Sequence, residues 1–477
     1  MNADTKIPFE RIDFALPIQR FRIEYSLVEK NAVPLVREFV LRLLWLSKMT
    51  LGEIAAFMGF TQKEARVAVT QLLELNEVSI GEDGRLELTD KAKAYFRNSA
   101  DGSPRIAQLI DRRDTFRFEL VSFGYVTKNK GSEDWRFSIK LEPDMEKRSR
   151  SAVFARKSFQ RYFFEIYHAG DIERFGKEGN EIPDIYKISD VSPQREDYVK
   201  IPQILYLNVQ SGEVERSEIE GFDEQDEIIG KITDAILSHR KSDSHRKIDN
   251  LASVSRAMEE LGGHSLLDCL SKDGVDVPKF LLGALNEPEA GGTTRRMFGS
   301  LQLASNWDRV VGLFKKHGQL TSKKTGSGTD EVTWLVPSSP FWGRTDKIQE
   351  CISTVLGLSS DPKSNQKLFD LSLKLPLHGK EDRAAKRWLS EFRDFRQVLH
   401  GYVEGYCQGD VELIIYPGCF AVVLFHVVPP RTWVPIPMGF LTEDKNLVSR
   451  IEQSLGDYLS DLSSDDGVKD LGKITRS

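Results

Sequence analysis

Four polar residues between positions 62 and 70 have the types and spacing of a helix face that reads nucleic acid. Gln62, Lys63, Arg66 and Thr70 would lie on the outward side of a short helix, with Gln71 at its edge. Glutamine can form two hydrogen bonds to adenine, arginine can do the same to guanine, and lysine can pair with a phosphate. These side chains therefore have the chemistry for contacts with double-stranded DNA.

Local signals around this face predict two consecutive helices. Thr50 and Glu53, and again Thr61 and Glu64, have the three-residue spacing of a capping box, so each pair is expected to begin a helix. Gly59 would end the first of the two. The buried side of the second helix is expected to comprise Ala65, Val67, Ala68, Leu72 and Leu73.

A helix before this pair and a hairpin after it complete the unit. Pro34 stands where the first turn of a helix tolerates proline, and apolar residues follow at helical spacing from Val36 to Leu46. After Asn76 the apolar period falls to two, and Gly84 occupies the turn between two short strands. Residues 34–97 resemble the winged helix-turn-helix superfamily, in the broad style of MarR-like domains. An unrelated small α+β unit with the same elements is the alternative.

The resemblance implies that the second helix of the pair enters the major groove and that Arg85, on the wing, reaches the DNA backbone or the minor groove. The charge balance argues against strong DNA binding by this unit alone. Residues 34–97 contain nine basic and nine acidic residues, with Glu82 and Asp83 at the wing tip. Because phosphate neutralisation supplies most non-specific affinity, the unit is expected to need further contacts, or to dock a protein instead.

A second candidate contact with nucleic acid is the segment 147–161 (KRSRSAVFARKSFQR), which contains no acidic residue. Its basic residues are Lys147, Arg148, Arg150, Arg156, Lys157 and Arg161. Phe154 and Phe159 lie among them, and basic side chains for phosphate with aromatic ones for base stacking are typical of a nucleic-acid groove. The alternative is an amphipathic helix whose aromatic side chains lie in the core and whose charges are solvated.

Few residues have the spacing of a catalytic motif, and the sequence contains neither a Walker-type phosphate loop nor a GxSxG pattern. His378 and Lys380 follow a strand-like run and match the His-x-Lys of phospholipase D-like nucleases, but the acid of that motif would fall at Ala385. Asp410 and Glu412 precede an apolar strand, as in a metal-dependent nuclease, yet no lysine follows at the required spacing. No catalytic residue, metal ion or cofactor is therefore predicted.

Length and composition predict several domains in a cytoplasmic protein. The chain has 477 residues, of which 40% are hydrophobic and 29% charged, with a net charge of −6. This length is too great for one ordinary core. Its four widely spaced cysteines lack metal-ligand spacing and are expected to be reduced thiols. Neither a signal peptide nor a membrane span is expected.

The fold class expected from these patterns is α+β and multidomain. The predicted parts are a winged helix at 34–97, a mixed α/β middle domain at 110–250, a helical connector at 251–290, a C-terminal α/β domain at 301–460 and a mobile tail at 461–477. Ahead of them, residues 7–30 are expected to form an arm or a short strand.

The leading functional hypothesis is a non-enzymatic, DNA-associated component of a larger bacterial assembly with partner protein subunits. A winged helix joined to long regions without a catalytic motif also resembles accessory subunits of bacterial antiphage defence systems. Two alternatives stay open. One is a phosphodiester-cleaving enzyme with a degenerate phospholipase D-like C-terminal domain. The other is a transcription regulator whose ligand binds below the apolar strands at 411–428.

Overall fold

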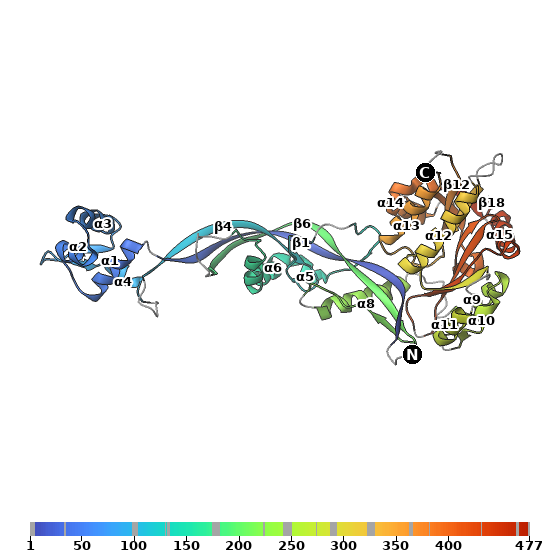
Figure 1. The fold of residues 1–477 in the computed structure, drawn as a ribbon, viewed down its shortest axis with the longest axis horizontal. Coiled ribbons are helices and arrows are strands. Elements are labelled where there is room, and N and C mark those ends of the chain that lie inside the picture. The colour runs from blue at the N-terminus through green and yellow to red at the C-terminus, as the bar shows by residue number, and fades with distance from the viewer. Residues whose placement is uncertain are drawn as a thin grey trace. The chain divides into compact units, whose positions relative to one another are not determined.

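The protein is a mixed α+β chain with several sheets, shown as a computed structural model in Figure 1. The structure describes all residues except 1–4, 33–34, 98–103, 129, 131–133, 174–181, 223–224, 242–249, 273, 287–292, 322–329, 362–365, 381, 431, 464–466 and 476–477. Pro34 of the predicted winged helix and residues 287–290 of the predicted connector therefore lie outside the described residues. Across the described ranges, no helix is both long and apolar enough to cross a membrane.

The chain divides into two compact units, and each is described by itself. The larger unit contains Met1–Pro17, Gly131–Asp144 and Asp197–Ser477. The smaller unit contains Ile18–Lys130 and Met145–Glu196. Two long strands, β1 (Lys6–Ala32) and β6 (Asp184–Asn208), contribute residues to both.

Within the smaller unit, residues 35–97 form three helices, a two-stranded hairpin and a short fourth helix, here called the helix–hairpin unit (Figure 1). Its elements are α1 (Leu35–Leu46), α2 (Leu51–Met58), α3 (Gln62–Glu74), β2 (Val78–Ile80), β3 (Leu86–Leu88) and α4 (Asp90–Ala94). These occur in the predicted order. Both capping boxes are confirmed, since Thr50 and Thr61 each exchange hydrogen bonds with the glutamate three residues later. Gly84, at a positive φ of 74°, lies in the hairpin turn as predicted.

The rest of the smaller unit is built on a long antiparallel pair of strands. Strand β4 (Arg105–Glu119) pairs with β1 in one unbroken register from Ile18 opposite Glu119 to Ala32 opposite Arg105. Three helices follow in the chain: α5 (Met145–Ser149), α6 (Ser151–Arg161) and α7 (Phe163–His168). Apolar side chains of α6 and α7 pack with those of β1 and β4 in one core. The expectation of an arm or short strand at 7–30 was wrong, because this segment has a long partner strand far along the chain.

The larger unit is built on an eight-stranded mixed sheet in the order β10-β16-β15-β14-β11-β12-β13-β19. Its strands are β10 (Thr294–Phe298), β11 (Asp330–Leu335), β12 (Phe369–Leu377), β13 (Leu399–Val403), β14 (Val411–Tyr416), β15 (Phe420–Val427), β16 (Ile436–Thr442) and β19 (Asp470–Lys473). Strands β11, β12 and β13 are parallel neighbours, whereas the remaining pairs are antiparallel. Shorter strands of this unit are β5 (Ile139–Lys140), β7 (Val214–Arg216), β8 (Leu270–Ser271), β9 (Gly274–Val275), β17 (Leu462–Ser463) and β18 (Gly467–Val468).

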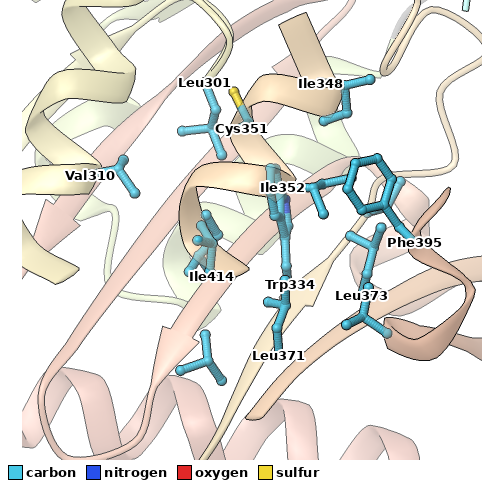
Figure 2. Packing of buried hydrophobic residues seen from close by; sticks show 14 of the residues in the cluster. Leu301, Val310, Trp334, Ile348, Cys351, Ile352, Leu371, Leu373, Phe395 and Ile414 are labelled. Carbon is cyan, nitrogen blue, oxygen red and sulfur yellow. The ribbon is translucent and has the colours of Figure 1, made fainter. Parts of the chain in front are cut away.

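Helices cover both faces of this sheet. One face packs against α12 (Ala304–Thr321), α13 (Lys347–Leu358) and α14 (Arg383–Glu391), and Figure 2 shows part of this core around Trp334, Ile352 and Ile414. The other face packs against α9 (Leu251–Glu260), α10 (His264–Leu267), α11 (Val277–Asn286) and α15 (Lys445–Ser460). The remaining helices of this unit are α8 (Gln225–Lys241) and two 3-10 turns, η1 (Arg393–Val398) and η2 (Tyr406–Gly409).

Two expectations about this unit change. Helices α9 to α11, expected in a connector, form a layer on the sheet because Val254, Met258 and Phe280 are buried against its strands. The mobile tail expected from 461 onward contains β19, whose Asp470 pairs with β13 residue Tyr402. The carboxylate of Asp470 also accepts a hydrogen bond of 2.8 Å from the largely buried ammonium of Lys374 on β12. This ion pair attaches β19 to the sheet.

A buried carboxyl on β1 gives the larger unit a specific pH dependence. Burial raises the pKa of Glu10 to about 8, and the negative charge of Glu412 adds to the rise. The folded protein therefore keeps a proton that the unfolded chain releases near pH 4.5, so its stability falls as pH rises toward 8.

We expect Glu10→Gln to remove this dependence, since the amide needs no proton. From about pH 6 to about pH 8, wild type should lose about 2 kcal/mol of unfolding free energy relative to the variant. Urea unfolding of both proteins at a series of pH values measures this loss. Parallel curves for the two proteins would contradict the assignment.

Candidate nucleic-acid interface

Helices α2 and α3 are joined by a tight turn at residues 59–61. Gly59 ends α2 at a φ of 68°, and its backbone N–H donates to the carbonyl of Ala55. Thr61 then begins α3, where its backbone N–H and hydroxyl donate to the carboxylate of Glu64 at 2.9 and 2.8 Å. These bonds lower the pKa of Glu64 and hold its charge at the helix start. Two helices joined by a short glycine-containing turn are the geometry of a helix-turn-helix.

The residues predicted to read DNA share the exposed side of α3. Gln62, Lys63, Arg66 and Thr70 are all exposed, while Ala65, Val69 and Leu72 face the core of the helix–hairpin unit. Val67 lies on the outward side with 56% of its surface exposed, so its predicted burial was wrong. The helical period brings Lys63, Val67 and Thr70 onto one outward stripe, with Arg66 beside it.

The basic residues of this face differ from most others in the helix–hairpin unit. Five basic side chains there pair with carboxylates: Arg37 with Glu77, Arg42 with Glu38, Lys48 with Glu87, Arg85 with Glu53, and Lys93 with Asp90. Within residues 35–97, all of which the structure describes, Lys63 and Arg66 form no ion pair. Two neighbouring cations on α3 are therefore available to an outside anion.

The hairpin is hydrogen-bonded to the segment between α1 and α2. Strand β3 bonds to the segment before α2, since Met49 and Leu86 exchange two backbone hydrogen bonds of 3.3 and 2.7 Å. Arg85 donates to the carbonyl of Lys48 at 3.0 Å and lies 3.5 Å from the carboxylate of Glu53. The predicted wing contact thus has partners inside the protein, which sequence reasoning did not foresee.

A buried ionic cluster supports the back of α3. Glu77, which is fully buried, accepts a 2.8 Å hydrogen bond from the Nε of Arg37 on α1 and a 3.0 Å bond from the hydroxyl of Tyr95. Burial and this carboxylate raise the pKa of Tyr95 to about 12. The cluster joins α1, the start of the hairpin and the end of α4.

The basic segment 147–161 forms α5 and α6, and several of its cations have partners within the smaller unit. Lys147 donates to the carbonyl of Val121 at 2.6 Å. Arg148 forms a two-pronged ion pair with Glu196, at 3.2 and 2.7 Å. The partners of the others are Glu146 for Arg150, the Ile188 carbonyl for Arg156, and the Tyr162 ring for Arg161. Lys157 is exposed and, among described residues, has no ion pair.

The aromatic side chains of this segment do not form a stacking platform. Phe159 is buried between Tyr25 and Phe116, with ring centroids 4.9 Å from each. Phe154 stacks on the buried ring of Phe123 at 5.1 Å. The prediction of aromatic stacking with nucleic acid was wrong here, because the apolar face of α6 completes the core of the smaller unit.

The candidate catalytic residues lie at the end of β12. His378 is exposed, and its Nδ1 is 3.0 Å from a carboxylate oxygen of Glu404. Lys380 lines a cavity beside α14. Asp382 caps α14 by accepting the backbone N–H of Ala384 at 2.9 Å, and its other carboxylate oxygen accepts the backbone N–H of His378 at 2.9 Å. The structure thus gives His378 a carboxylate partner, whereas the neighbouring acid Asp382 serves as the N-cap of α14.

The two acids considered for a metal-dependent nuclease are buried inside the larger unit. Asp410 accepts a 2.8 Å hydrogen bond from Ser253. Glu412 accepts bonds from the indole nitrogens of Trp334 and Trp342. In the part of the chain that the structure describes, no group of three or more His, Cys, Asp or Glu side chains is placed to hold a metal ion.

Comparisons with known proteins add little to these observations. No family model matches the sequence, and no curated protein matches it. Part of the chain is similar to the solved structure of TrmBL2, an archaeal chromatin protein described as having a novel mode of DNA binding. The match has 12% sequence identity and a TM-score of 0.19, and it covers 43% of this chain and 63% of that one. The likeness is distant.

Proposed function

We propose that residues 35–97 are a winged helix-turn-helix unit and that α3 binds the major groove of double-stranded DNA. The observation that carries this proposal is the exposed face of α3. There Lys63 and Arg66 have no ion pair, in a unit where five other basic side chains pair with carboxylates. Recognition helices of this class contact bases from their N-terminal residues, and these two residues lie in the first turns of α3.

Each residue of this face has a role suited to its chemistry. Arg66 and Gln62 can each form paired hydrogen bonds to a purine edge, and Lys63 supplies a phosphate contact. Thr70, one turn further along, can bond to a base or a phosphate. Val67 adds an exposed apolar surface suited to the methyl group of thymine.

The affinity of one helix–hairpin unit should be modest, because its net charge is zero. Lys157 on α6 is a second exposed cation without an ion pair among the described residues, and it is the member of the 147–161 segment most open to phosphate. The proposal therefore extends to a non-enzymatic role in a larger bacterial assembly, such as an antiphage system, whose other subunits add DNA contacts.

Exposed apolar side chains in the helix–hairpin unit support a protein partner. They include Leu35, Val36, Phe39, Trp45 and Leu46 on α1 and Phe57 on α2. Val36 and Leu46 belong to the apolar helical pattern of α1, yet they are 44% and 79% exposed. Groups of exposed apolar residues often mark protein contacts.

Titration of duplex DNA into the full chain at rising salt tests the DNA proposal. If α3 contacts phosphates, the logarithm of the binding constant should fall linearly with the logarithm of salt concentration, with a slope of about −2 or steeper. Fluorescence anisotropy of a labelled duplex measures it. Absence of binding at low salt, with the protein shown to be folded, would refute the proposal.

A further inference from the structure

A cavity of about 870 Å³ lies in the larger unit, where β12 ends. Leu377 of β12, helix α14, Gly401 of β13 and residues 471–475 at the edge strand β19 line it; α14 and β12 are labelled in Figure 1. Its volume is within the range of about 300–1,000 Å³ that is usual for sites of small molecules. Ligand sites of α/β sheets also commonly lie at the carboxyl ends of parallel strands.

The lining of this cavity is strongly basic. Among the described residues, the charged side chains that line it are those of Lys380, Arg383, Lys386, Arg396 and Lys473 and of one acid, Asp382. The whole chain carries a net charge of −6, so five cations against one carboxylate at one place is a marked local reversal. A recess lined by one sign of charge concentrates the field and attracts ions of the opposite sign.

Most of these cations have no carboxylate of their own. Among the described residues, Arg383, Lys386 and Lys473 form no ion pair. Arg396 donates its Nε to the carbonyl of Leu389 at 3.3 Å and also has no ion pair there. Asp382, the acid among the described lining residues, already accepts hydrogen bonds from the backbone N–H groups of His378 and Ala384.

Nearby basic residues behave differently. Arg344 bonds to Glu391 at 2.9 Å, and Lys374 bonds to Asp470 at 2.8 Å. Both pairs belong to elements that border the cavity, since Glu391 ends α14 and Asp470 begins β19. The fold therefore compensates these neighbouring cations, whereas Arg383, Lys386, Arg396 and Lys473 keep their charges without an ion pair among the described residues.

We propose that this cavity binds a small molecule with several phosphate charges, of the size of a nucleoside diphosphate. Two guanidinium groups can hold phosphate oxygens in pairs, and the lysines add point charges. The apolar wall of Leu377, Leu389 and Ile474 offers a surface for a base or another apolar part. This site is separate from the expected ligand place below β14 and β15, since both strands are buried along their whole length. It does not depend on the proposed DNA binding.

Calorimetric titration of the full chain with adenosine diphosphate and with pyrophosphate tests the site. Both should bind at low salt, with the nucleotide tighter because it also contacts the apolar wall. Lys386→Gln combined with Lys473→Gln should weaken both by about tenfold or more. The matched control, Lys279→Gln, changes an exposed lysine on α11, on the other face of the sheet, and should leave both affinities unchanged.

Three outcomes would overturn the proposal. One is the absence of binding by either ligand to folded protein. Another is a double variant whose affinities match those of the control. The third is an equal loss of duplex DNA binding in the double variant, which would assign these cations to a nucleic-acid backbone. The substituted side chains are exposed, so both proteins should fold, and thermal unfolding checks this; Lys386→Gln alone serves if the double variant does not.

Discussion

Reversing both free charges of α3, with Lys63→Glu and Arg66→Glu, should lower the affinity of the full chain for duplex DNA by about a hundredfold or more. Each lost contact to a phosphate or a guanine is worth about 1–3 kcal/mol, and the new glutamates repel the DNA backbone. The slope of affinity against salt should also become shallower by about 2. Anisotropy titrations of both proteins on one duplex measure both effects.

A matched control separates α3 from general charge. Lys279→Glu with Lys445→Glu makes the same charge change at two exposed lysines that have no ion pair among the described residues and no proposed contact with DNA. This control should lose much less affinity. An equal loss in both double variants would mean that DNA is attracted by overall charge and that α3 is not the reading helix. Since Lys63 and Arg66 are exposed, an unchanged circular dichroism spectrum is expected for both variants.

The helix–hairpin unit was predictable because its signals are local. Thr61 and Glu64 are only three residues apart, and Gly84 itself indicates the positive φ that the hairpin turn needs. Local signals do not set burial on a small unit, however. Val36 and Val67 fit an apolar helical face, yet their side chains are 44% and 56% exposed.

The elements that the sequence did not predict depend on distant partners. The length of β1 becomes clear only when β4 is known, since Ile18 pairs with Glu119. Strand β19 is similar, because its attachment depends on Lys374 and Tyr402, far earlier in the chain. The sequence of segment 147–161 fits both a nucleic-acid groove and an amphipathic helix. Only the structure distinguishes them, because it shows that Tyr25 and Phe116 bury Phe159.

The candidate sites also differ in whether local sequence signals predict them or residues far apart in the chain form them. Lys63 and Arg66 could be placed on an exposed helix face from periodicity alone. The basic cavity could not, since its cations come from α14, η1, β19 and the end of β12, and no spacing in the sequence brings these together. Conversely, Asp410 and Glu412 have the types of catalytic acids, but their hydrogen-bond partners lie on other elements and give them a structural role.

Glu412 is therefore expected to matter most for stability. It is 1% exposed, and one carboxylate oxygen accepts the indole N–H of Trp334 at 3.0 Å and that of Trp342 at 2.8 Å. Its other oxygen lies 3.4 Å from the Nε2 of the buried His426. This one side chain satisfies two buried donors between β11, β14 and the segment before α13.

Glu412→Ala should destabilise the larger unit by about 4–6 kcal/mol, because each buried donor left without a partner costs about 1–3 kcal/mol and the shortened side chain leaves a cavity. Glu412→Gln keeps an oxygen for both indoles and should cost only about 1–2 kcal/mol. Glu331→Ala, at an exposed glutamate of β11, should be close to neutral. Urea unfolding followed by tryptophan fluorescence compares the three. If Glu412→Ala and Glu412→Gln lowered the stability equally, the fold would require the buried charge and not the position of the acceptor oxygen. An alanine variant as stable as wild type would show that the two tryptophans do not depend on Glu412.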